Sequence, residues 1–162
     1  MKVIFKKSDL ANAVNIVMKA VPSKTTMSIL ECILINASTN EIKLTANDME
    51  LGIETIVEGE IIEKGIIAID AKIFSEIVRK LPDNEVVIET DEHLQTTITC
   101  EKAKFNISSK AGDEFSYLPY VEKNETITLS QFCLKEIIRQ ITDMSNQRYM
   151  MRGVSAAKED VH

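Results

Sequence analysis

One pattern constrains the fold more than any other feature of this 162-residue chain: a short apolar strand, a polar step and an amphipathic helix recur three times. The predicted helices span residues 8–21, 70–81 and 130–141. Within each helix the apolar side chains follow the i, i+3, i+4, i+7 spacing of one buried face. The copies align without gaps, which equates Leu10 with Phe74 and Leu134, Ala13 with Ile77 and Ile137, Val14 with Val78 and Ile138, and Val17 with Leu81 and Ile141.

Polar residues and prolines mark the ends of these helices. Ser8, Asp70 and Ser130 each stand just before an apolar stripe, where a short polar side chain can cap the first free N–H groups. Pro22 and Pro82 lie just beyond the first two stripes, as expected for helix ends.

Strand-like segments follow the first two helices in threes. Residues 29–37, 41–46 and 51–61 follow the first helix, and residues 86–90, 94–100 and 103–107 follow the second. The repeating unit is therefore βαβββ, present twice before about residue 110. Two antiparallel sheets backed by two helices would bury both helix stripes, so the sequence predicts an α+β domain with internal pseudo-symmetry.

The end of the chain contains an unfinished repeat. Residues 111–123 have little periodicity and are predicted to form a linker, and a third unit that starts at Glu125 does not reach its last strands. We expect one complete domain over 1–122 and the incomplete start of a second over 123–162, so that the chain is the front part of a longer repeat protein. The fold of the polar tail 154–162 is left open.

The charge distribution is uneven. The chain has 19 basic and 25 acidic residues, a net charge of −6, which counts against a protein that grips nucleic acid through phosphate contacts. Segment 41–63 contains one lysine and seven acidic residues and so carries that whole net charge, on strands expected to face solvent. The exposed helix faces are neutral to mildly basic. A solvated surface explains any one such face, but the bias recurs in pseudo-equivalent helices.

Several functional classes lack the residues that they need. No apolar run is long enough to span a membrane, and the first ten residues do not form a signal peptide. Three widely spaced cysteines without a CxxC pair indicate reduced thiols of a cytoplasmic protein. His93 and His162 cannot build a metal site or a catalytic triad, and the pair Asp48 and Glu50 lacks a third ligand. We therefore predict no metal, no cofactor and no catalytic residues.

Several segments, in this order, resemble the bacterial DNA sliding clamps, the beta subunits of DNA polymerase III. They are Lys24-Thr25-Thr26-Met27-Ser28-Ile29-Leu30, Leu44-Thr45-Ala46-Asn47-Asp48-Met49-Glu50, Phe74 to Pro82, Phe105-Asn106-Ile107-Ser108, Phe115-Ser116-Tyr117-Leu118-Pro119 and Gln147-Arg148-Tyr149. The resemblance extends from Met1 to about Gly153. It implies the DNA-clamp fold, with helices lining the central hole of a ring and sheets outside.

The resemblance also implies a function and partners. Clamps of this family are head-to-tail rings of two three-domain chains that encircle duplex DNA without regard to sequence and tether the replicative polymerase. The chain would thus be a non-catalytic processivity subunit of a DNA-directed DNA polymerase. It would lack most of the second domain and all of the third. Its partners would be duplex DNA, a second clamp chain, the clamp loader and the polymerase alpha subunit, with no membrane.

Individual residues take expected roles from the same resemblance. Those expected to contact DNA are Lys24 in a loop, Lys72 and Arg79 on the inner helix, and Gln147, Arg148 and Tyr149 in the second domain. Phe105 and Ile107 match edge-strand residues of the dimer interface, and Met151 matches a residue of the pocket that receives partner peptides.

The sequence departs from the family at three of these places. Met150 replaces a second aromatic residue, Ile73 stands where some members have an interface lysine, and Ser28 replaces a proline, which is expected to leave the loop that carries Lys24 less rigid.

Simpler interpretations stay open. Lys24 can be an ordinary solvated lysine, and Phe105 and Ile107 can face the core of their own domain. The whole chain can be a small α+β interaction module without a role on DNA. A hydrolase using carboxylates is the least favoured alternative, since no nucleophile and base stand together.

Overall fold

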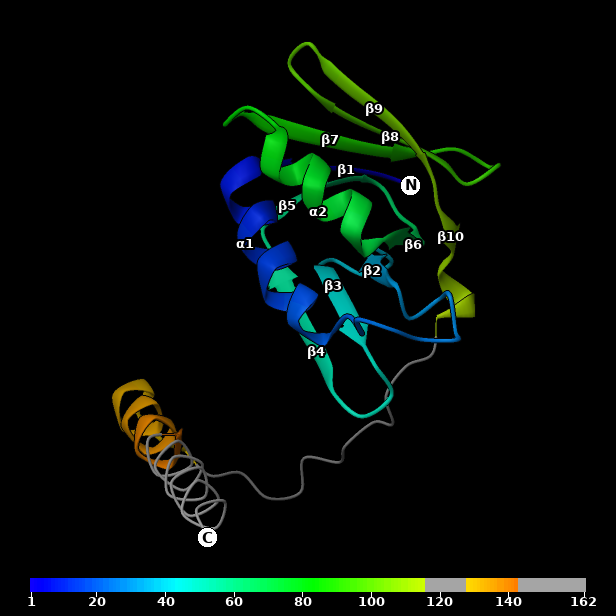
Figure 1. Ribbon diagram of the computed structural model, residues 1–162. Coiled ribbons are helices and arrows are strands. Elements are labelled where there is room, and N and C mark those ends of the chain that lie inside the picture. The colour runs from blue at the N-terminus through cyan, green and yellow to red at the C-terminus, as the bar shows by residue number, and fades with distance from the viewer. Residues whose placement is uncertain (116–127, 143–162) are drawn as a thin grey trace, which may run out of the picture. The chain divides into compact units, whose positions relative to one another are not determined.

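The computed structural model describes residues 1–115 and 128–142, and contacts divide the chain into two units, Met1–Pro119 and Tyr120–His162 (Figure 1). In the first unit the helices are α1 (Lys7–Val17) and α2 (Ala71–Lys80), with short 3-10 helices η1 (Met18–Ala20) and η2 (Gly112–Glu114). Its strands are β1 (Lys2–Lys6), β2 (Cys32–Asn36), β3 (Ile42–Asn47), β4 (Gly52–Val57), β5 (Gly59–Glu63), β6 (Ile66–Asp70), β7 (Glu85–Thr90), β8 (Gln95–Cys100), β9 (Ala103–Ser108) and β10 (Lys110–Ala111).

The strands form two antiparallel sheets, in the orders β5-β1-β7-β8-β9 and β10-β6-β2-β3-β4. Each sheet combines the first strand of one repeat with the last three strands of the other. Ile4 of β1 thus pairs with Val87 of β7, and Ile33 of β2 pairs with Ile69 of β6. The predicted α+β fold with two related βαβββ units is confirmed, and the exchange of first strands joins the two units.

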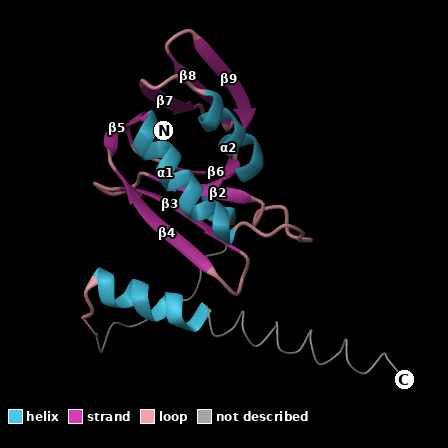
Figure 2. Ribbon diagram, turned by 60° about the vertical axis from the view of Figure 1, so that its left-hand side comes forward, coloured by secondary structure: helices cyan, strands magenta, loops and turns pink. Residues whose placement is uncertain are grey.

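Both helix stripes are buried, as predicted. Leu10 and Val14 of α1 and Phe74 and Val78 of α2 are at most 1% exposed. They join Phe5, Ile33, Ile88 and other strand residues in one apolar core. The helices lie side by side over the sheets, and α1 contacts α2 directly (Figures 1 and 2). Because the core uses one face of each helix, the opposite faces are left for solvent or a ligand.

The predicted strand 51–61 is wrong as a single element. The chain leaves the second sheet at Glu58, and its continuation, β5, pairs with β1 in the first sheet. Gly59 allows this crossing, because a Cβ there would stand 2.6 Å from the carbonyl oxygen of Ile4. An alternating pattern does not report such a change of partner, since the core-facing residues Ile53, Val57 and Ile61 keep the same two-residue period through both strands.

The first helix begins earlier than its sequence indicates. Helix α1 starts at Lys7, and Ser8 does not cap it; the Ser8 hydroxyl instead donates to Asp9 Oδ1 at 3.3 Å. The other two caps form as expected. Asp70 Oδ1 accepts from the backbone N–H of Ile73 at 2.8 Å, and Ser130 Oγ accepts from that of Cys133 at 3.1 Å.

The expected linker begins inside the folded unit. Residues 111–115 belong to β10, η2 and the buried Phe115, which packs with Leu34, Ala68 and Cys32. Residues 116–123 lie outside the described part of the chain. The second sheet is therefore covered by the core on one face and partly by Phe115 on the other.

The described part of the second unit contains one helix, residues 131–142. Its predicted apolar stripe, Leu134, Ile137, Ile138 and Ile141, is 41–63% exposed. Thr128 and Leu129 precede this helix without strand structure, while the rest of the predicted strand lies outside the described residues. The helix thus presents an apolar face like those that α1 and α2 bury.

Candidate nucleic-acid interface

A groove of about 310 Å³ runs between α1 and α2. It is lined by Lys7, Ala11, Val14 and Asn15 of α1 and by Ser75, Val78 and Arg79 of α2. Val14 and Val78 are buried and form an apolar floor, while Lys7 and Arg79 supply the charge. A groove with one cation from each helix and no lining carboxylate suits an anionic ligand.

The exposed side of α2 continues this basic surface. Lys72 and Arg79 are seven residues apart, almost two helical turns, and therefore lie on the same side of the helix. Glu76 lies between them, but its carboxylate forms an ion pair with Lys80 at 3.8 Å. The side of α2 that carries both predicted contact residues is therefore net positive.

Lys24 lies in the loop that connects η1 to β2, residues 21–31, which we call the Lys24 loop. Its side chain is exposed. The loop is shaped by the backbone N–H of Met27, which donates to Thr25 Oγ1 at 3.1 Å, and by that of Leu30, which donates to the carbonyl oxygen of Met27 at 3.0 Å. Lys24 therefore lies on a loop, separate from the basic residues of the two helices.

The sequence did not identify Lys7 as a candidate residue. The expected cap at Ser8 placed Lys7 outside the helix, whereas the structure makes it the first helical residue, facing the groove beside Arg79. The spacing of residues 7, 11 and 14 could have indicated that Lys7 faces the groove, because positions with this spacing share one side of a helix.

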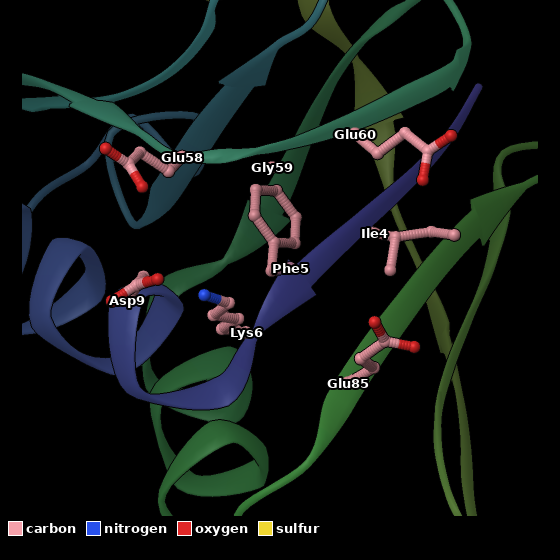
Figure 3. Close-up of a pocket in the computed structure, with 8 residues that line it drawn as sticks. All are labelled: Ile4, Phe5, Lys6, Asp9, Glu58, Gly59, Glu60 and Glu85. Carbon is pink, nitrogen blue, oxygen red and sulfur yellow. The ribbon is translucent and has the colours of Figure 1, made fainter.

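The opposite side of α1 is acidic. Two adjoining hollows of about 240 and 300 Å³ share Asp9 and Glu58, and Figure 3 shows Glu60 and Glu85 beside the first of them. As predicted, the acidic residues of segment 41–63 are exposed or half-exposed, and Lys43 pairs with Glu54 at 3.0 Å. Helix α1 thus separates a basic groove from an acidic surface.

Phe105 and Ile107 lie on β9, an edge strand of the first sheet. Both side chains are half-buried and pack against the core, so the simpler interpretation of their direction is correct. The backbone edge of β9 stays unpaired within the described residues, and Ile73 on α2 is 50% exposed. A role in a dimer interface remains a prediction. Gln147, Arg148, Tyr149, Met150 and Met151 lie outside the described residues.

Of the two carboxylates Asp48 and Glu50, that of Asp48 has a structural role. Asp48 Oδ1 accepts the backbone N–H groups of Leu51 at 2.7 Å and Glu50 at 3.0 Å, in the turn between β3 and β4. These hydrogen bonds, with that from Leu51 the stronger cause, hold the pKa of Asp48 below its ordinary value. In the described ranges no three His, Cys, Asp or Glu side chains gather as metal ligands.

None of the helices within the described ranges is long and apolar enough to cross a bilayer. All three cysteines are free thiols; Cys32 and Cys100 are buried and Cys133 is exposed. Among the features described above, the groove between α1 and α2 has the clearest preference for a ligand, because its lining contains Lys7 and Arg79 and no carboxylate.

A family profile and curated relatives match this chain to the same protein family. Residues 1–119 match the sequence profile of the family described as the DNA polymerase III beta subunit, N-terminal domain. The chain is 36% identical to the beta sliding clamp of Staphylococcus epidermidis, in an alignment covering 99% of this chain and 45% of that protein. It is also 36% identical to the beta sliding clamp of Bacillus subtilis, covering 96% of this chain and 44% of that protein.

Solved structures give the same result. A DNA polymerase III beta subunit from Eubacterium rectale is 72% identical, with a TM-score of 0.83, over 86% of this chain and 38% of that one. The sliding clamp of Bacillus subtilis has a TM-score of 0.81 at 36% identity, over 86% of this chain and 39% of that one. The chain thus spans less than half the length of the relatives that it matches.

Proposed function

The chain belongs to the DNA polymerase III beta subunit family, and from this premise we propose that it forms part of a processivity ring, which encircles duplex DNA and tethers the replicative polymerase. The chain contributes no catalytic residue to this function. Residues 1–122 form the first clamp domain and residues 123–162 the start of the second. Further domains, corresponding to the remaining length of the relatives, complete the ring.

The separation of charge across α1 supports this function most directly. Lys7, Lys72 and Arg79 lie along the helices, whereas Glu58, Glu60 and Glu85 lie on the other side of α1. A ring that encloses DNA needs positive potential on the surface that faces the phosphates. An outer surface that is acidic discourages binding of DNA elsewhere. A net charge of −6 is therefore compatible with a protein that holds DNA by enclosing it.

The remaining contacts complete the proposal. Lys24, Gln147, Arg148 and Tyr149 touch the duplex, while Phe105 and Ile107 lie at the junction with a second clamp chain in a head-to-tail homodimer. Met151 belongs to a pocket for peptides of the polymerase alpha subunit and the clamp loader. The protein works in the cytoplasm, where bacterial DNA is replicated.

Duplex binding by the 162-residue chain tests the role of the helix face. We expect weak, sequence-independent binding whose affinity falls with salt concentration. Lys7→Ala and Arg79→Ala should each weaken binding and lower the slope of log affinity against log salt by about one. Lys104→Ala on β9 is the matched control, because it removes an equal charge away from the helix face.

Two results would contradict the proposed function. Tight binding to one DNA sequence would contradict a sliding function, since base-specific contacts hold a protein at one place. Equal affinity of Lys7→Ala, Arg79→Ala and Lys104→Ala would favour an interaction module that does not use this face for DNA.

A further inference from the structure

Lys110 and Ser28 are 82 residues apart in sequence and in direct contact in the fold. The Lys110 ammonium donates to both the carbonyl oxygen and the hydroxyl oxygen of Ser28, at 2.9 Å each. Lys110 is half-buried on β10, which pairs with β6 through Lys110 and Ala68. Its backbone is therefore fixed by the second sheet, whereas Ser28 is exposed in the Lys24 loop.

The Ser28 carbonyl joins the middle of the loop to the rest of the domain, while the loop's end is held by the buried Leu30 and by Glu31, whose carbonyl oxygen accepts the Ala71 N–H at 2.9 Å. Besides the Lys110 ammonium the Ser28 carbonyl accepts the Cys32 thiol, whose sulfur is 3.7 Å away at the start of β2. The hydrogen bonds from Met27 and Leu30 lie within the loop itself. They shape the loop and leave its attachment to the sheet to other contacts.

We propose that Lys110 is a positioning residue for the Lys24 loop, holding it against the second sheet so that Lys24 is presented to DNA in one arrangement. The role in DNA binding rests on the proposed function; the attachment of the loop does not. A charged donor forms stronger hydrogen bonds than a neutral one, and an ammonium has donors for both Ser28 oxygens. The Ser28 hydroxyl, which a proline at this position would lack, supplies one of these two acceptors.

Lys110 differs from a direct DNA contact in a measurable way. Two of the three N–H donors of its ammonium are directed to Ser28, so we expect its effect on DNA to pass mainly through the loop. Removing it should therefore lower affinity only while Lys24 is present. A lysine that bound phosphate directly would instead weaken binding in either background and lower the salt slope.

Hydrogen exchange of the 162-residue chain tests the attachment without DNA. Lys110→Met should speed exchange of the Met27, Leu30 and Cys32 amides by roughly three- to tenfold, the loss expected for a partly exposed charged hydrogen bond. Lys110→Arg should restore most of the protection, since arginine can donate to the same oxygens. Amides of β7 and β8 should exchange as in the wild type, which verifies that the fold is intact.

Two further variants separate loss of the Lys110–Ser28 contact from other effects of the Lys110 substitution on hydrogen exchange. Ser28→Ala changes an exposed residue and removes only the hydroxyl acceptor, so it should give a smaller increase in exchange than Lys110→Met. Lys104→Met is the matched control and should leave loop exchange unchanged. Unchanged loop exchange in both Lys110→Met and Ser28→Ala would overturn the proposal.

Duplex affinity, measured in a double-mutant cycle with Lys24→Ala, tests the consequence for DNA. Lys110→Met should weaken binding by roughly threefold or more in the wild-type background and have no further effect in the Lys24→Ala background. Equal losses in both backgrounds would overturn the positioning role. A wild-type chain that fails to bind any duplex would contradict the proposed function, while the exchange result would still decide whether Lys110 holds the loop.

Discussion

The backbone of Gly59 lies directly against the ring of Phe5: a Cβ at Gly59 would stand 2.8 Å from Phe5 Cδ1. The two residues pair across β5 and β1 (Figure 3), where the chain has just crossed from one sheet to the other. Phe5 is 1% exposed and belongs to the main core. The absence of a side chain at Gly59 is thus what permits β5 to close over β1.

Gly59→Ala should lower the free energy of unfolding by about 1–3 kcal/mol, because the added methyl group would force Phe5 or β5 to shift. Gly52→Ala, on the edge strand β4, is the matched control and should change stability by less. Urea denaturation of both variants measures the difference. Equal stability of Gly59→Ala and the wild type would show that β5 can move outward at little cost.

Substitutions at Asp70 and Ser8 compare a helix start that has a side-chain cap, that of α2, with one that has none, that of α1. Asp70→Ala should destabilise the protein by about 1 kcal/mol because it removes the acceptor for the Ile73 N–H, whereas Asp70→Asn should retain most of the stability. Ser8→Ala should be nearly neutral, since Ser8 caps no N–H group of α1. Thermal unfolding of the three variants decides between this arrangement and the one that the sequence predicted.

Asp48 makes part of the stability depend on pH. Its folded-state pKa lies below the ordinary value because the Leu51 and Glu50 N–H groups stabilise the carboxylate. The stabilisation is therefore complete above the unfolded-state pKa and is lost as pH falls through the folded-state pKa. Asp48→Asn should be less stable than the wild type at neutral pH, and the gap should narrow in strong acid. A gap that is constant over this pH range would show that the carboxylate charge is not responsible.

The three thiols should react in a fixed order. Burial raises the pKa of both the Cys32 and Cys100 thiols, so little reactive thiolate forms at either position in mildly alkaline solution. Cys133 is exposed. Iodoacetamide should therefore modify Cys133 first and the buried pair only after unfolding, as mass spectrometry can follow. Fast labelling of the folded Cys133→Ser variant would contradict this order.

Local periodicity predicted much of the candidate site. Lys72 and Arg79 could be assigned to the exposed side of the second helix because the buried positions, such as Phe74 and Val78, repeat with the period of a helix. Lys7 was missed although its spacing fits, since its place on the helix depends on where the first helix begins and that start has no side-chain cap. Lys110 could not be assigned, because its partner Ser28 is 82 residues away.

The sequence by itself determined the repeated βαβββ unit, the buried stripes of its helices and the exposure of the acidic strands. These properties follow from side chains that are neighbours along one helix or strand. Only the tertiary structure decided that β1 pairs with β7 and β6 with β2, that β5 crosses to the first sheet, and that Lys7 and Arg79 line the same groove. The physical reason is that backbone ladders form between any suitably placed strands. Which strands pair therefore depends on how the whole core packs, and the sequence of a short segment does not determine its partner strand.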